Sequence, residues 1–91
     1  MYYVYVLISR KDSLFYTGFT RDLHRRVSEH NQGLQDSTKN RTPLDLVYYE
    51  GCLNKEDAIA REKYLKSGMG KKFLRSRLRQ HLGTRSNQIA Q

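Results

Sequence analysis

The longest apolar run of the chain is YYVYVLI, residues 2–8, and this run constrains the fold more than any other segment. It is rich in tyrosine, valine and isoleucine, which favour β-strands, and the charged segment 10–12 follows it. Alternation along a strand separates two sets of side chains: Val4, Val6 and Ile8 on one face, and Tyr3, Tyr5 and Leu7 on the other. The run predicts a first strand, and it is far shorter than the ~20 residues of a membrane span.

The segments that follow this strand change from strand to helix pattern and back. LFYTGF, residues 14–19, predicts a second strand joined to the first by a hairpin. Apolar positions recur at helical spacing over 21–32, and the polar segment 34–43 predicts a loop. LDLVYYEGCL, residues 44–53, predicts a third strand.

Two helices are predicted in the last third of the chain. Asn54 is a suitable N-cap for a helix that continues to Ser67, where Gly68 and Gly70 are expected to end it. Residues 71–82 predict a last helix with its leucines inward and its arginines outward.

The order of these elements is ββαβαα, which predicts an α+β fold with a small three-stranded antiparallel sheet flanked by helices. At 91 residues the chain has the length of one domain. We expect that domain to occupy residues 1–82 and the segment 83–91 to be a disordered tail.

The charge is concentrated in the second half of the chain. The 17 Lys and Arg against 9 Asp and Glu give a formal net charge of +8. Residues 1–50 contribute +1, residues 51–91 contribute +7, and no acidic residue follows Glu62. A one-sided basic segment predicts a polyanionic partner, with nucleic acid ahead of an anionic membrane. The basic amphipathic segment 71–82 leaves membrane or groove binding open as a weaker alternative, because a folded domain needs its apolar residues for the core.

Cys52 is the single cysteine, so the sequence excludes an intramolecular disulfide and a cysteine-based zinc site. This usage fits a reducing compartment, and we expect a cytoplasmic protein. The sequence does not give the oligomeric state, and a monomer is favoured.

Polar side chains stand where apolar ones are expected on both main helices. Arg26 and His30 lie one turn apart at the edge of the inward face of helix 21–32. They either bind something there, or Arg26 reaches solvent and His30 is satisfied within the fold. Glu62 falls among the apolar positions of the next helix, which leaves a structural ion pair with Arg26 or Lys66, or a metal ligand, as alternatives.

Two tyrosines and a glycine complete the set of unusual positions. Tyr5 and Tyr16 lie on paired strands and are predicted to share a sheet face, either as packed aromatics or as phenols that take part in chemistry. Gly18 weakens a strand, and it suggests a bulge or a close approach of the backbone to a ligand.

The spacing of these residues resembles the GIY-YIG nuclease superfamily. The first family motif corresponds to Tyr3-Val4-Tyr5 and the second to Tyr16-Thr17-Gly18. RDLHRRVSEHNQG, residues 21–33, is similar to the family's Arg-bearing helix, and Ala60-Arg61-Glu62-Lys63 is similar to its acid-bearing helix. The match covers residues 2–75 and is closest to small, stand-alone, uncharacterised bacterial members.

The resemblance implies an endonuclease that hydrolyses nucleic-acid phosphodiesters with Mg²⁺ or Mn²⁺, and DNA is the expected substrate. On this basis Tyr5 helps to deprotonate the attacking water, Tyr16 supports it, and Arg26 binds the scissile phosphate. His30 assists by hydrogen bonding or proton transfer, and Glu62 holds the cation.

Further residues are expected to contact the substrate: Gly18, Arg25, Lys66, Lys71, Lys72 and Arg75. Many family nucleases also carry an asparagine late in the domain, and residues 71–82 contain none. A non-catalytic nucleic-acid-binding module on the same fold therefore stays as the alternative hypothesis.

Overall fold

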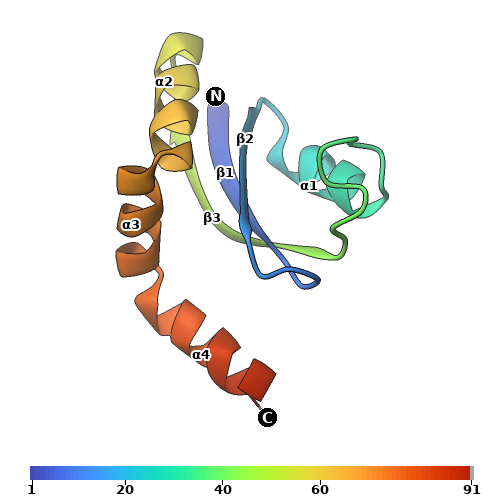
Figure 1. The fold of residues 1–91 in the computed structure, drawn as a ribbon. Coiled ribbons are helices and arrows are strands. Elements are labelled where there is room, and N and C mark those ends of the chain that lie inside the picture. The colour runs from blue at the N-terminus through green and yellow to red at the C-terminus, as the bar shows by residue number, and fades with distance from the viewer. Residues whose placement is uncertain (91) are drawn as a thin grey trace.

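The protein folds around a three-stranded antiparallel sheet, as the sequence predicts. A computed structural model describes residues 1–90, with side chains described through Arg85. The strands are β1 (Tyr2–Ser9), β2 (Phe15–Thr20) and β3 (Leu44–Cys52), arranged in the order β2-β1-β3 (Figure 1). The apolar run that opens the chain thus forms the central strand, and the α+β class is confirmed.

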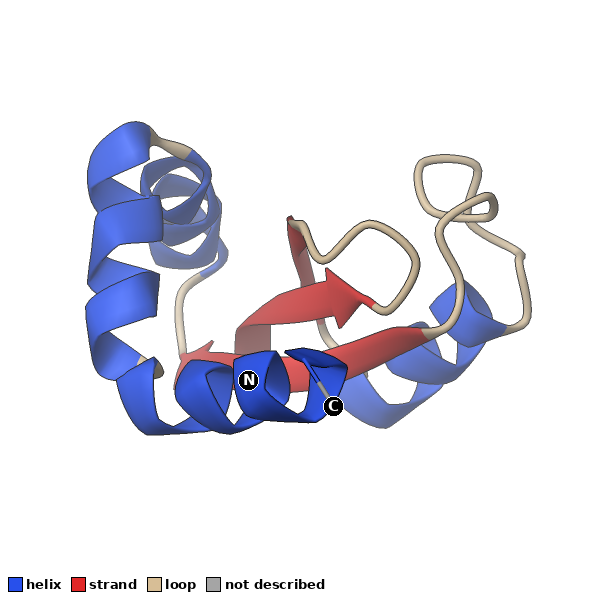
Figure 2. Cartoon of the chain, turned by 60° about the horizontal axis from the view of Figure 1, so that its bottom comes forward, coloured by secondary structure: helices blue, strands red, loops and turns tan. Residues whose placement is uncertain are grey.

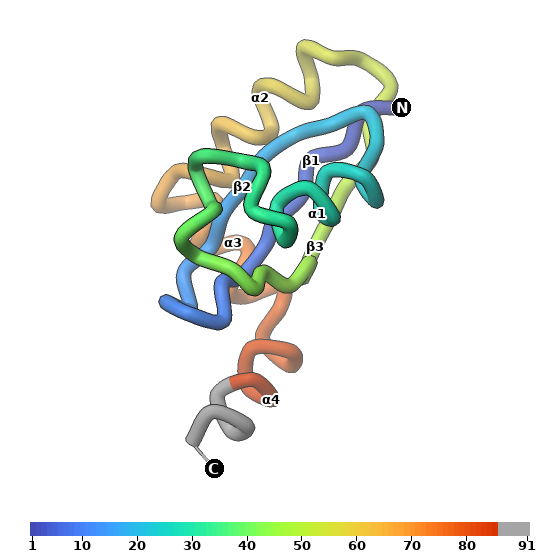
Figure 3. Tube along the Cα trace, turned by 90° about the vertical axis from the view of Figure 1, so that its right-hand side faces the viewer, coloured from blue at the N-terminus to red at the C-terminus, as the bar shows by residue number. Residues whose placement is uncertain are grey.

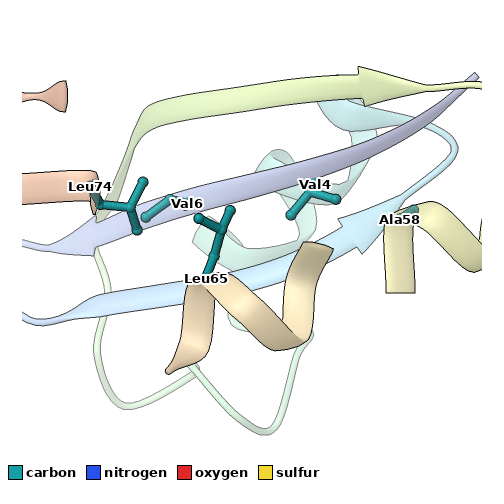
Figure 4. Close-up of a cluster of buried hydrophobic side chains, with 5 residues drawn as sticks. All are labelled: Val4, Val6, Ala58, Leu65 and Leu74. Carbon is teal, nitrogen blue, oxygen red and sulfur yellow. The ribbon is translucent and has the colours of Figure 1, made fainter. Parts of the chain in front are cut away.

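The central strand is buried on both faces because helices cover both sides of the sheet. Val4 and Val6 pack with Ala58, Leu65 and Leu74 on one side (Figure 4). On the other side Tyr5 and Leu7 form a second cluster with Leu44. The two faces predicted by alternation are therefore the two halves of the core. This division also determines which side chains of β1 point toward the candidate site.

The helix α1 (Leu23–Asn31) covers the Tyr5 face, and α2 (Lys55–Lys66) covers the Val4 face (Figure 1). Each helix begins at a side-chain cap that accepts a backbone hydrogen bond. Asp22 Oδ1 accepts from the Arg25 amide at 3.1 Å, and Asn54 Oδ1 accepts from the Glu56 amide at 2.8 Å. The predicted start of both helices is confirmed to within two residues.

The C-terminal helices differ from the prediction of a single helix at 71–82. The structure has α3 (Gly68–Arg77) and α4 (Arg79–Ala90), with a break at Leu78 (Figure 2). The two glycines do not separate α2 from α3; Ser67 does, because its hydroxyl donates to the Tyr64 carbonyl and accepts from the Gly70 amide. Among the described residues, no helix has both the length and the hydrophobicity of a membrane crossing.

The segment 83–91, which the sequence predicts to be a tail, begins within α4, and its disorder stays a prediction. The helix α4 continues through Gly83 and Thr84 to Ala90, and Gln91 lies outside the described residues. A long-range ion pair gives the physical reason, since Arg85 Nη1 lies 2.8 Å from Asp45 Oδ2 on β3. Sequence periodicity contains no information about this pair, which is 40 residues apart.

Gly70 is buried where the chain turns from α2 into α3. A Cβ atom placed there would collide with the Tyr64 carbonyl oxygen and lie 2.5 Å from Leu65 Cα. These are backbone atoms, so neither is free to move aside. Hence the glycine is required by the close approach of two successive helices.

We therefore expect Gly70→Ala to lower the free energy of unfolding by about 2–3 kcal/mol, the usual size of an overpacking penalty. Gly68→Ala is the matched control: Gly68 is also in the first turn of α3, but nothing lies within 4 Å of its Cβ position. That variant is expected to be neutral or to gain up to about 1 kcal/mol. Urea denaturation of both variants measures the difference, and equal stabilities would contradict the packing argument.

Candidate functional site

A buried chain of hydrogen bonds connects β1, α1 and the loop that follows α1. The Tyr5 hydroxyl and His30 Nε2 lie 2.8 Å apart, and His30 Nδ1 lies 2.6 Å from Thr38 Oγ1. Tyr5 is 1% exposed, and His30 and Thr38 are fully buried. Both ring nitrogens of His30 are therefore used, which is the satisfied histidine that the sequence left as one alternative. Thr38 was not predicted, because a loop threonine carries no periodic signal.

Tyr16 joins this cluster from the neighbouring strand. Register pairs Tyr16 with Leu7 and Gly18 with Tyr5, so the two tyrosines share a sheet face, as predicted. Their rings both meet His30 edge-on, with centroid distances of 5.0 Å for Tyr16 and 5.7 Å for Tyr5. The loop of residues 32–43 passes beside α1 and brings Ser37 to the Tyr16 hydroxyl at 3.2 Å (Figure 3).

Gly18 forms neither the bulge nor the ligand contact that the sequence suggested. The β1–β2 register is regular across it, and the irregularity of the sheet lies between Val6 and Leu7 against β3. A Cβ at Gly18 would lie 2.6 Å from the Tyr5 hydroxyl oxygen. The space that we expected to admit a ligand is filled by the phenol of Tyr5, so Gly18 positions that phenol.

Arg26 lies at the mouth of the cluster with its side chain 37% exposed. Its Nε donates to Glu29 at 3.2 Å, and Arg25 Nε donates to the other oxygen of the same carboxylate, also at 3.2 Å. Glu29 was missed as a site residue, although an acid three and four residues after two arginines is a recognisable helix pairing. The charge of Arg26 is close enough to lower the pKa of both Tyr5 and His30.

Burial dominates the ionisation of the cluster. It raises the pKa of Tyr5 to about 12, with the neighbouring Tyr16 adding to the rise and Arg26 only partly opposing it. Burial also lowers the pKa of His30 from its usual 6.5, helped by the charge of Arg26. Both groups are thus neutral at pH 7 in the protein alone. The charge of Arg26 does not by itself make Tyr5 a phenolate.

Glu62 faces inward from α2, as the helical wheel predicts. Its side chain is 20% exposed, and its partner is Lys66 Nζ at 3.6 Å, not Arg26. Its charge also contributes to the raised pKa of Tyr5, which places the two groups within electrostatic reach. The described residues contain no group of three or more His, Cys, Asp or Glu that could hold a metal ion. A single carboxylate suits a hard cation that keeps most of its ligands as water and phosphate oxygens.

The residues predicted to contact substrate separate into two places. Arg25 and Arg26 line a cavity of about 630 Å³ beside the start of α1, where Arg21 and Lys55 add charges that the sequence reasoning did not single out. At the other end of the sheet, Lys71 and Arg75 line a second cavity. Lys66 is engaged with Glu62, and Lys72 is exposed.

The central strand thus carries a tyrosine that lies close to a histidine and an arginine from α1, and α2 on the opposite face of the sheet carries an inward glutamate. The chain matches the family model described as the GIY-YIG catalytic domain over residues 1–73. This protein belongs to the GIY-YIG family, as its sequence motifs indicated.

The relatives found by comparison are UPF0213 proteins. The chain is 45% identical over 67 residues to UPF0213 protein CPE1444 of Clostridium perfringens, covering 72% of this chain and 71% of the relative. It is 38% identical over 69 residues to UPF0213 protein YazA of Bacillus subtilis, covering 75% and 70%. The solution structure of UPF0213 protein BH0048 from Bacillus halodurans is similar at 36% identity, with a TM-score of 0.53 and 84% coverage of each chain.

The buried neutral His30 makes stability depend on pH in a defined window. Because its pKa is lower in the folded protein than the unfolded value of 6.5, the unfolded chain binds the extra proton first. The contribution of neutral His30 to the free energy of unfolding is therefore fully present above pH 6.5. It is lost as the pH falls toward the lowered pKa of His30 in the folded protein, by at most about 1.4 kcal/mol per pH unit.

Urea denaturation between pH 8 and pH 5 measures this slope, with His30→Gln as the comparison that lacks the titrating group. Three carboxylates have a pKa that is lowered by arginine partners: Asp12, Asp45 and Glu50. They change the free energy of unfolding only as the pH falls to their usual pKa near 4, which lies below the pH range in which His30 acts. An identical slope in wild type and His30→Gln above pH 5 would contradict the burial argument.

Proposed function

We propose that this protein is a nucleic-acid endonuclease that hydrolyses phosphodiesters, with DNA as the first substrate to test. The observation that carries the proposal is the hydrogen-bonded chain Tyr5–His30–Thr38 ending beside Arg26. Membership of the GIY-YIG family supports it, because that domain implies a nucleic-acid substrate in general terms.

Tyr5 activates the attacking water while it passes its own proton to His30. A free phenolate is not populated near neutral pH, since the pKa of Tyr5 is about 12. Transfer of the water proton to the Tyr5 oxygen, together with transfer of the phenol proton to His30 Nε2, avoids that species. This requires the His30 tautomer that donates from Nδ1 to Thr38 Oγ1 and leaves Nε2 as the acceptor.

Arg26 binds the scissile phosphate through a planar guanidinium whose charge is permanent. Its half-exposed position suits this role, because one nitrogen is held by Glu29 and the rest of the fork is free to meet an anion. Glu62 would hold a divalent cation such as Mg²⁺ or Mn²⁺, which would supply charge neutralisation at the phosphate and a water of lowered pKa. Lys66, now paired with Glu62 at 3.6 Å, would be close enough to that carboxylate to contact the same phosphate.

The test is cleavage of labelled single-stranded, duplex and branched DNA, and of RNA, with and without Mg²⁺ or Mn²⁺. We expect Glu62→Gln and Arg26→Lys each to lower kcat/KM by about 100-fold or more, the usual cost of removing a transition-state charge contact. Tyr5→Phe removes the proton acceptor and is expected to cost about 100- to 10,000-fold.

Glu56→Gln is the matched control, because Glu56 is an exposed carboxylate on the same helix as Glu62. It is expected to keep full activity. If wild type and Glu62→Gln show the same background on every substrate, the enzymatic proposal is wrong. Salt-sensitive binding that is unchanged in Arg26→Ala and Glu62→Ala would then establish the alternative, a non-catalytic nucleic-acid-binding module.

A further inference from the structure

A second cavity lies away from the Tyr5–His30 cluster, and its lining comes from the β1–β2 hairpin, α3 and α4. The course of the hairpin and of these two helices can be followed in Figures 1 and 2. The cavity has a volume of about 590 Å³, within the size range of pockets that take small organic groups. Its apolar lining includes Leu14, Phe15 and Leu82, and Leu14 is 62% exposed. An exposed leucine on a hairpin beside an open cavity is available to contact a ligand.

The cationic lining of this cavity has two different parts. Arg41 is paired with Asp12 at 2.7 Å, and Arg85 is paired at 2.8 Å with Asp45, a carboxylate that Arg10 also contacts. Both arginines are therefore held by ion pairs within the fold. Lys71 and Arg75 form no salt bridge with any side chain in the described part of the chain, and both are exposed. The cavity therefore presents two available positive charges, one helical turn apart on α3, beside an apolar surface.

This combination fits one nucleotide unit better than a bare anion or a bare apolar group. The apolar lining suits the face of a base, and Lys71 and Arg75 suit the phosphates on either side of it. A base that is stacked and paired inside a duplex cannot enter a cavity. The lining of this cavity therefore suits an unpaired nucleotide.

The cavity also lies where it can contact the same nucleic-acid strand that the candidate site binds. Phe15 precedes Tyr16 on β2, and their side chains point to opposite faces of the sheet. Arg41 lies in the same loop as Thr38, and its amide donates to the Thr38 carbonyl at 2.8 Å. Because β2 is an edge strand of the sheet, a nucleic-acid strand held at Arg26 and Tyr16 would cross that edge to reach this cavity.

We propose that the cavity between the β1–β2 hairpin, α3 and α4 binds an unpaired nucleotide of the substrate strand. Lys71 and Arg75 hold its phosphates, and the leucine and phenylalanine side chains contact its base. This inference rests on the proposed function for the identity of the strand, and it adds that the substrate is unpaired beside the cleavage position.

The test is binding of a fluorescein-labelled oligothymidylate to Glu62→Gln protein without divalent metal, so that cleavage has no effect on the result. Lys71→Ala and Arg75→Ala are each expected to weaken binding roughly fivefold or more and to reduce the salt slope by about 0.7. Lys63→Ala and Arg77→Ala remove equally exposed positive charges outside the cavity, and they are expected to change binding less than about twofold.

Leu14→Ser tests the contact with the base. It is expected to weaken binding of the oligothymidylate but not of an abasic strand of the same length, whereas Leu34→Ser changes neither. Leu34 is a suitable control because it is 64% exposed and lies outside this cavity. A blunt duplex of the same length is expected to bind equally to the Leu14 and Leu34 variants.

Equal losses for Lys71→Ala and Lys63→Ala would overturn the proposal, because they would show a diffuse charge effect. The proposal would also be overturned if Leu14→Ser weakened binding of the abasic strand as much as binding of the oligothymidylate. If the wild-type protein cleaves nucleic acid but the cavity variants bind the oligothymidylate as tightly as their controls, only this inference is refuted. Cavity-dependent binding by a wild-type protein that cleaves nothing refutes only the nuclease proposal.

Discussion

The burial of β1 on both faces is the constraint on which the rest of the structure depends. Valines on one side of the strand anchor α2 and α3, and Tyr5 and Leu7 on the other side anchor the layer that contains α1. Because alternate residues serve opposite layers, the strand that forms the core also carries a phenol into the candidate site. Stability and site geometry therefore depend on the same eight residues, Tyr2–Ser9.

Burial also determines the chemistry that the site can perform. Tyr5 and His30 are removed from water, so each resists its charged form and each needs the other as a hydrogen-bond partner. Such an environment favours proton transfer between neutral, hydrogen-bonded side chains over a tyrosine that is already ionised. Arg26 stays at the surface, where its charge remains available to an anion.

The positive charge of the second half of the chain is not one uniform surface. Arg61 and Arg85 are each paired with a carboxylate on β3 and serve the fold. Lys71 and Arg75 stand beside an apolar cavity instead, which separates them from the arginines that support structure. Net charge alone indicated a polyanionic partner, and only the pairing pattern indicates which charges are free to meet it.

The sequence by itself determined the three strands, the start of each main helix and the two faces of β1, because these follow from local periodicity. Motif spacing also nominated a candidate set of site residues: Tyr5, Tyr16, Arg26, His30 and Glu62. Tertiary structure decided the rest. The Thr38 contact with His30 and the Arg85–Asp45 ion pair join positions whose proximity depends on packing, and so does the continuation of α4 past residue 82. The raised pKa of Tyr5 is decided there too, since desolvation is a property of the folded core and not of the residue type.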